Sequence, residues 1–558
     1  PMKTLFKVKT RREISSSRRV MSLLCRDQCL KIGWLCYGVF ALVSCWTISD
    51  SAAQQIRVVP SISVIEQYDS NVFFTPKSLL APGTKVDDFI TVVTPQLNFM
   101  QSNSLVKTNL SVGAVVQKFV NNSALDNVGF NASTGIDLSQ AVNRILPRMR
   151  GARIFGTYMY TPSAPAFGAG SLGGGAGMGG GGFGGGGFGA GGIGIAGPID
   201  SGLLTQRIRT TMFNAGFANS YSLSPTTDFQ TTYTYSQLSF GGSFTPSTTV
   251  SGQAQNTVFD TTTHSISAGP TSQISAIDTL TVKYTFMQMS QAQFGDYATH
   301  GGTLGWGRAW TKEWSSSLNG GLTLVEPIPD TSTTGGQRRI PATMFPTGGF
   351  SVTYASGSSF LRKLGSEIQE ATGTSGAGSV GGGGFLPLLA GMNMPGGIAA
   401  PGSYRVTLMY NLGVFPSFVQ SAGPIYTHTI LLGGTAGITD RLSAQALFNY
   451  ARSSYTSEAI GTTFSTYGTT VSLNYLITPM LTARLSHQWL KFDNQTSGVS
   501  AADFGFAKQV VLLGFTYAYS PRGDFFRSGA FWEGPSGASS SAESGVSKSG
   551  SGGVDTKK

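Results

Sequence analysis

The chain offers few residues for catalysis or metal binding. Its only histidines are His264, His300, His428 and His487. No two of them have the spacing of metal ligands, and no Cys-x-x-Cys-His motif for haem attachment occurs. No nucleophile is recognisably matched with a base on a neighbouring segment. His487 alternates with the apolar Leu485 and Trp489, which predicts a position at a membrane interface. We therefore expect no enzyme, no cofactor and no metal.

Acidic and amide side chains gather around the first predicted strand pair. The set consists of Glu66, Asp69, Asn71, Asp87 and Asp88. Oxygen ligands of this kind suit Ca²⁺, so a ligand or calcium site is one interpretation of this acidic patch. The interpretation that we favour is that Asp69 and Asn71 fix a loop through hydrogen bonds between side chain and backbone.

Four cations fall on the polar faces of predicted strands. They are Arg153, Lys283, Arg405 and Arg484. A charge that faced lipid would destabilise the protein, so we expect these side chains to line an enclosed lumen. If they cluster, they bias a pore toward anions. The alternative, which we favour, is that each is paired locally with an acid and confers no selectivity.

The elements that must position these residues are amphipathic strands. In segment 404–412, Arg405 and Thr407 alternate with Tyr404, Val406 and Leu408, and a period of two puts each set on one face of a sheet. The same alternation occurs in 441–451, 469–477 and 510–519. Many segments run to about 10 to 13 residues, the reach needed to cross a bilayer at a tilt. We predict an all-β fold, a transmembrane antiparallel β-barrel of about 16 to 18 strands.

Tight turns alternate with longer polar loops, as they do in barrels with short periplasmic turns and long outer loops. The predicted turns are 224–228, 276–278, 311–313, 439–441 and 478–480, and the loops include 291–298, 326–343, 452–462 and 491–506. Trp310 and Trp314 flank one turn and Tyr475 precedes another. Aromatic rings at strand ends are typical of the girdle at a membrane interface.

Two glycine-rich insertions, 161–204 and 356–402, interrupt the alternation and are predicted to be mobile loops. Counting turns places the first insertion outside the cell. The second falls on the periplasmic side, where so long a segment is uncommon, and a miscounted strand within 344–403 would move it.

Residues 1–53 read as a signal peptide. They hold nine of the 38 Lys and Arg residues, an apolar run and all four cysteines, with the small residues Ser51 and Ala53 before a predicted cleavage site. Segment 42–45 offers a competing lipoprotein cleavage box, in which Cys45 would carry lipid. The barrel is then expected over 54–520, without a thiol, and 521–558 as a disordered tail. No basic stripe for nucleic acid remains.

Two segments resemble known families. Residues 512–519 look like the terminal signal read by the outer-membrane barrel assembly machinery, with Gly514, Tyr517 and Tyr519 at the expected spacing. They depart from it because Leu512 replaces a polar residue and a tail follows. Residues 61–73, 88–91 and 94–97 are similar to the type-2 β-barrel porins, which include outer-membrane proteins linked to exosortase and exopolysaccharide loci. This resemblance implies an outer-membrane barrel, and a link to surface polysaccharide, but no chemistry.

These observations predict a bacterial outer-membrane protein that acts as a passive, porin-like channel for small hydrophilic solutes or oligosaccharide. Two alternatives stay open: a barrel without an open pore that anchors a surface layer, and a secreted, soluble β-rich adhesin. The expected partners are outer-membrane lipid, the assembly machinery and surface polysaccharide, and a homotrimer is left open. The transported solute is not predicted.

Overall fold

The protein is described here from a computed structural model, which covers residues 55–73, 77, 83–103, 105–165, 207–244, 260–291, 295–328, 342–356, 401–415, 425–455, 462–496 and 505–519. The predicted signal peptide, the predicted tail and most of both glycine-rich insertions lie outside the described residues.

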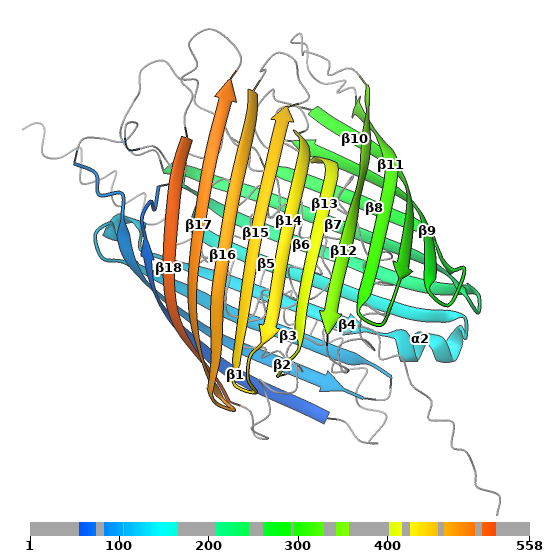
Figure 1. Cartoon of the computed structure of the whole chain (residues 1–558), viewed down its shortest axis with the longest axis horizontal. Coiled ribbons are helices and arrows are strands. Elements are labelled where there is room, and N and C mark those ends of the chain that lie inside the picture. The colour runs from blue at the N-terminus through cyan, green and yellow to red at the C-terminus, as the bar shows by residue number, and fades with distance from the viewer. Residues whose placement is uncertain are drawn as a thin grey trace, which may run out of the picture. The chain divides into compact units, whose positions relative to one another are not determined.

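The described chain forms one sheet of 18 antiparallel strands (Figure 1). Each strand pairs with its neighbours in sequence, and β1 pairs with β18, so the sheet closes on itself. The predicted fold class is confirmed, and the strand number falls at the upper end of the predicted range. The strands are β1 (Gln55–Asp69), β2 (Asp88–Ser102), β3 (Lys107–Phe119), β4 (Asn127–Asp137), β5 (Met149–Pro165), β6 (Arg207–Ser224), β7 (Thr227–Phe244), β8 (Thr261–Gln273), β9 (Asp278–Gln291), β10 (Gly295–Ala309), β11 (Trp314–Ile328), β12 (Thr343–Ser356), β13 (Tyr404–Phe415), β14 (Ile425–Gly437), β15 (Leu442–Tyr455), β16 (Thr462–Thr478), β17 (Leu481–Thr496) and β18 (Gly505–Ala518).

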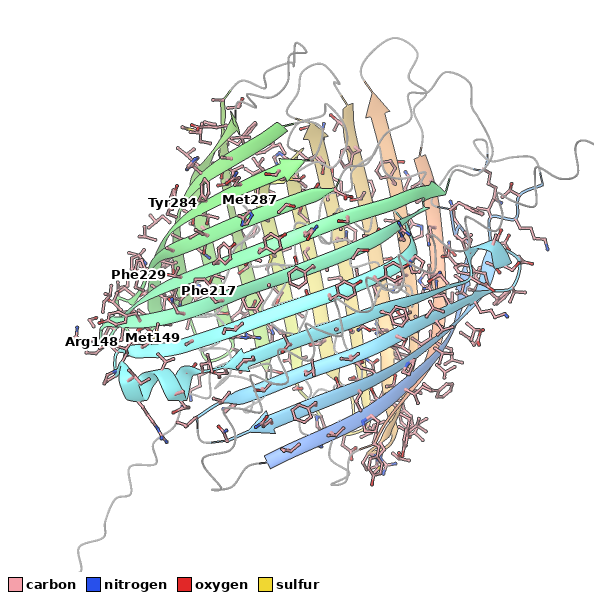
Figure 2. The ribbon with its side chains drawn as sticks, turned by 180° about the vertical axis from the view of Figure 1, so that it is seen from behind. Arg148, Met149, Phe217, Phe229, Tyr284 and Met287 are labelled. Atoms are coloured by element: carbon pink, nitrogen blue, oxygen red, sulfur yellow. The ribbon has the colours of Figure 1, made fainter. Side chains whose placement is uncertain are left out.

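The alternation seen in the sequence separates the outer face of the barrel from its inner face. On β18, Val511, Leu513 and Phe515 are exposed, whereas the intervening Val510 and Leu512 are buried. The exposed apolar side chains recur around the outside, for example Phe217 on β6 and Phe229 on β7 (Figure 2). Because the described strands form a single closed sheet, no second sheet of described residues covers this apolar surface. Lipid is the solvent that suits it.

The two ends of the barrel differ in their connections. At one end, here called the short-turn end, β6 and β7 are joined by residues 225–226, β8 and β9 by 274–277, β10 and β11 by 310–313, β14 and β15 by 438–441, and β16 and β17 by 479–480. The opposite, long-loop end carries the connections 70–87, 166–206, 245–260 and 329–342, among others. The predicted turns are therefore confirmed, and the short-turn end corresponds to the periplasmic side of such barrels.

The second glycine-rich insertion joins β12 to β13 at the short-turn end. Ser356 and Tyr404 are register partners, and Gly437 receives a backbone hydrogen bond from Gly402 and donates one to Ser403. Because β12 and β13 pair directly, no further strand separates them in the described sheet. The strand order therefore places this long connection at the short-turn end, where long connections are uncommon.

Among the described residues, two short helices lie in the connections: η2 (Ser123–Leu125) at the long-loop end and α2 (Ser139–Ile145) at the short-turn end. In the described residues there is no helix with the length and apolar character needed to span a membrane.

Aromatic side chains gather on the outer face at the short-turn end. Trp314 lies 4.7 Å from Tyr354, and Tyr354 lies 5.5 Å from Tyr404, measured between ring centroids. Trp310 and Tyr475 are also exposed near turns, as predicted from the sequence. His487, in contrast, lies midway along β17 rather than near a strand end. The aromatic rings form the belt expected at a lipid–water interface.

Candidate functional site

The inner face of the barrel is the candidate site, because it is the only described surface that gathers polar side chains from every strand. Hydroxyl and amide residues occupy inward positions such as Thr407 and Asn411 on β13 and Thr427 and Thr429 on β14. Most of these side chains are shielded from solvent; Thr407 and Thr427 are 0% exposed. The inward side chains of the described wall are thus polar and largely covered.

A polar stripe runs up the inner face of β16 and β17. Asn474 pairs in register with Arg484, and Ser486 and Gln488 continue the inward positions of β17. Among the described residues, Asn474 Oδ1, Arg484 Nε, Ser486 Oγ and Gln488 Oε1 are buried and have no hydrogen-bond partner in the protein. Leaving such an atom unpaired costs about 1–3 kcal/mol, and buried polar groups are normally satisfied by protein or water. These four atoms need either water or another polar group that reaches the polar stripe.

The four predicted cations all face inward near the short-turn end. Arg153 is on β5, Lys283 on β9, Arg405 on β13 and Arg484 on β17, each within the first six residues of its strand. The spacing of four strands distributes them around the wall, so they do not cluster at one point. Arg57 on β1 occupies the equivalent inward position and was not singled out in the sequence. We call these five residues the cation ring.

Acidic side chains lie beside only some of the residues of the cation ring. Asp137 on β4 is the register partner of Arg153. Asp228 also faces inward at this end, but Arg150 already pairs with it at 3.2 Å. The register partner of Arg484 on β18 is Gly514, which carries no charge. Among the inward residues named here at the short-turn end, basic side chains outnumber acidic ones.

The wall is apolar toward the long-loop end, around the seam where β1 meets β18. Val72 and Leu125, from two connections, pack on strand residues to form the seam cluster. The strand members of the seam cluster are Ile65, Ile90, Val92, Phe119 and Leu512. Next to it, Phe492 stacks on Phe506 with ring centroids 5.7 Å apart and lies 6.0 Å from Phe464. These inward rings were not predicted, although each keeps the period of two of its strand.

The structure does not bring the predicted acidic patch together. Asp69 faces inward and binds Lys508, while its Oδ1 accepts a hydrogen bond from the backbone N–H of Asn71 at 2.9 Å. Glu66 faces outward and accepts the Thr91 hydroxyl at 2.9 Å. Asp88 is buried on β2 and Asp87 is exposed. No group of three or more His, Cys, Asp or Glu side chains among the described residues is placed to hold a metal. The geometry supports the loop-fixing interpretation.

The residues of the predicted assembly signal occupy both faces of the last strand. Tyr517 and Tyr519 are exposed on the outer side, at the short-turn end. Gly514 faces inward, and a Cβ there would lie 2.9 Å from Cγ1 of Ile65 on β1. The glycine thus allows β1 and β18 to pack closely at the seam. Recognition by the assembly machinery stays a prediction.

A scan against protein families and a search of curated proteins both find no match. Among solved structures, the chain is similar to OpdK of Pseudomonas aeruginosa, solved with vanillate, at 11% identity and a TM-score of 0.36, over 83% of this chain and 99% of that one. It is similar to OccAB2 of Acinetobacter baumannii at 9% identity and a TM-score of 0.37, over 84% and 98%. It is also similar to OprD of Pseudomonas aeruginosa, at 10% identity and a TM-score of 0.35, over 83% of this chain and 94% of that one.

Similarity at these identities and TM-scores does not indicate a solute or a mechanism. The barrel itself supplies the assignment: 18 antiparallel strands closed into one sheet, an apolar outer face, a polar inner face and an aromatic belt. The chain is an outer-membrane β-barrel protein.

Proposed function

We propose that this barrel is a passive diffusion channel for small hydrophilic solutes. The observation that carries the proposal is the polar stripe, whose buried oxygen and nitrogen atoms have no protein partner among the described residues. A dry interior would leave each of them unsatisfied, at a cost of about 1–3 kcal/mol, wherever a plug supplied no polar partner. A lumen that holds water satisfies them all.

The mechanism would be geometric and electrostatic. A solute would exchange its hydration for contacts with the Ser, Thr, Asn and Gln side chains of the inner face. At the short-turn end it would pass the cation ring, whose basic side chains favour anions over cations. No covalent step is involved, and no enzyme activity is proposed.

A second candidate function is a barrel that anchors a surface layer without conducting. The observation that favours it is the shielding of the inner face, where side chains as polar as Thr407 and Thr427 are fully covered. A wall that bordered a wide aqueous channel, as in porins, would keep more of these side chains in contact with solvent. Shielding also supports a narrow or gated channel, so the two candidates differ in conductance rather than in fold.

The resemblance of residues 61–73 to the type-2 β-barrel porins supports a link to surface polysaccharide. In that case the solute would be an oligosaccharide, which hydroxyl and amide side chains can hydrogen-bond along the inner face. We propose this only as the solute class to be tested first.

Recording from single molecules in planar bilayers tests the channel. A folded sample is first selected by its heat-modifiable migration on gels. Discrete conductance steps that a hydrophilic oligosaccharide reduces in a dose-dependent way are the expected result. Folded protein that inserts into the bilayer but gives no steps would reject the channel and leave the anchor.

A further inference from the structure

Positive and aromatic side chains also meet on the outer face, near the long-loop end of β14 to β17 (upper ends in Figure 1). Arg452 on β15 is the register partner of His428 on β14. On the next two strands, Tyr467 is the register partner of Lys491. Arg452, His428 and Lys491 are exposed on the side that faces lipid. We call these four residues the rim patch.

Along the strands, the rim patch lies at the level of the lipid–water interface on the long-loop side of the membrane. Arg452 and His428 are each three residues from the long-loop end of their strands, and Lys491 is five residues from the end of β17. Below them the outer face is apolar, with Phe448, Val471 and Leu485 exposed. Cations at the bilayer midplane cost about 2–4 kcal/mol, whereas near an interface the cost falls to about 0–1 kcal/mol.

Contacts within the rim patch hold its polar groups in place. The Lys491 ammonium lies 2.9 Å from Asp493 and 5.9 Å from the centre of the Tyr467 ring. The Tyr410 hydroxyl is hydrogen-bonded to His428 Nδ1 at 3.0 Å. In the tautomer whose Nδ1 accepts that hydroxyl, Nε2 carries a hydrogen and remains available as a donor.

The spacing of the two cations suits one anionic group. Ser465 is the register partner of both Arg452 and Asp493, so the α-carbons of Arg452 and Lys491 are two strands and two residues apart. At about 4.8 Å per strand and 3.3 Å per residue, that separation is roughly 12 Å. Two long cationic side chains can converge on one group across this span. Among the described residues of this arrangement, Asp493 is the one carboxylate, so with a neutral His428 these side chains together carry a single net positive charge.

We infer that the rim patch binds the headgroup of an outer-leaflet lipid that carries a phosphate monoester. The guanidinium of Arg452 supplies the forked donor that matches phosphate oxygens, and Lys491 supplies a second charge. The position of the rim patch favours a lipid as its ligand, because these side chains face the membrane at the level of the lipid headgroups. The inference is independent of whether the barrel conducts.

The inference is tested by lipid binding to the full-length protein in neutral detergent, followed by native mass spectrometry. The probe is phosphatidic acid, with phosphatidylcholine of the same chains and inorganic phosphate as comparisons. We expect phosphatidic acid to bind at least about tenfold more tightly than phosphatidylcholine. Each of the variants Arg452→Gln and Lys491→Gln should weaken its binding about tenfold, the worth of one charge-assisted hydrogen bond.

The matched control is Lys118→Gln. Lys118 is also an exposed cation at the long-loop end, but its register partner Thr91 is hydrogen-bonded to the Glu66 carboxylate, which offsets its charge. This variant should bind phosphatidic acid as the unmodified protein does. Heat-modifiable migration confirms that each variant is folded. Unchanged affinity in the Arg452→Gln/Lys491→Gln double variant, or equal binding of phosphatidylcholine, would overturn the inference, as would displacement of the lipid by equimolar inorganic phosphate.

Discussion

Asp69 on β1 and Lys508 on β18 form an ion pair of 2.7 Å across the seam that closes the barrel. Both side chains are almost completely buried, with 5% and 3% of their surface exposed. The seam cluster lies beside them and includes Ile65 and Leu512, from the same two strands. Water is therefore largely excluded from the pair, so the two charges compensate each other in a poorly hydrated place.

Replacing Lys508 by Met should destabilise the barrel strongly. Removing one partner of a buried ion pair leaves an uncompensated charge, which typically costs about 3–5 kcal/mol. The Asp69→Asn/Lys508→Met double variant should recover much of that loss, because it removes both charges. The measurement is the urea concentration at which the folded, fast-migrating form disappears. A double variant less stable than Lys508→Met would contradict this account.

The face of each residue could be predicted from the sequence, but its partner across the seam could not. Period-two alternation placed Arg153, Lys283, Arg405 and Arg484 inward, and the structure has them there. An odd difference in position puts two residues of one strand on opposite faces, so the same rule separates Glu66 from Asp69. Asp87 and Asp88 differ in the same way. The acidic patch therefore divides between the two faces of the wall, and its carboxylates cannot converge on one ion.

The pairing of the last strand with the first, which closes the barrel, could not be predicted from the sequence. Asp69 meets Lys508 only because the last strand returns to the first, and the register of that pairing is set by the whole barrel. Strands are hardest to count over 344–403, because the insertion between β12 and β13 lies at the short-turn end, where turns are otherwise brief. The seam cluster and the rim patch likewise depend on pairings between strands, which alternation within one strand does not report.

Neutralising four of the five residues of the cation ring should change ion selectivity. The variant Arg153→Gln/Lys283→Gln/Arg405→Gln/Arg484→Gln keeps the inward side chains polar but removes four charges. In a wet lumen each charge is worth about 0.5–1 kcal/mol to a passing anion, which corresponds to about twofold to fivefold in permeability. The reversal potential across a KCl gradient should therefore shift toward cation selectivity. The control removes the outward cations Lys118 and Arg209, which face away from the lumen; a shift of the same size there would refute the role of the ring.

Replacing Asp88 by Ala should loosen the connection between β3 and β4. The carboxylate accepts the backbone N–H groups of Val120, Asn121 and Asn122 at 2.8 to 3.1 Å, and the Asn122 side chain at 2.9 Å. Hydrogen bonds to a charged group contribute about 1.5–3 kcal/mol each, so the loop loses its main anchor. Limited proteolysis should cut within 120–126 faster than in the unmodified protein. Asp87→Ala, at an exposed neighbour, should leave the rate unchanged, and equal cleavage of the two variants would contradict the prediction.

Gly216 on β6 is expected to tolerate no side chain. Phe155 on β5 is its register partner, and its ring lies over the glycine, so that an added Cβ would come within 2.6 Å of Phe155 Cζ and would overlap the backbone oxygen of Tyr233. Alanine should therefore force the ring or the strand to shift, at about 1–3 kcal/mol. The reason is steric, because alanine otherwise favours an extended strand over glycine.

Gly302 on β10 provides the matched control for this steric effect. It is exposed, and a Cβ built there meets no atom within 4 Å. Gly302→Ala should leave the urea midpoint of unfolding unchanged or raise it slightly, whereas Gly216→Ala should lower it. Since both substitutions change backbone entropy in the same way, the difference between the two midpoints isolates the contact with Phe155. Equal midpoints would mean that the ring moves aside without cost, and that the close packing of β5 on β6 does not stabilise this part of the wall.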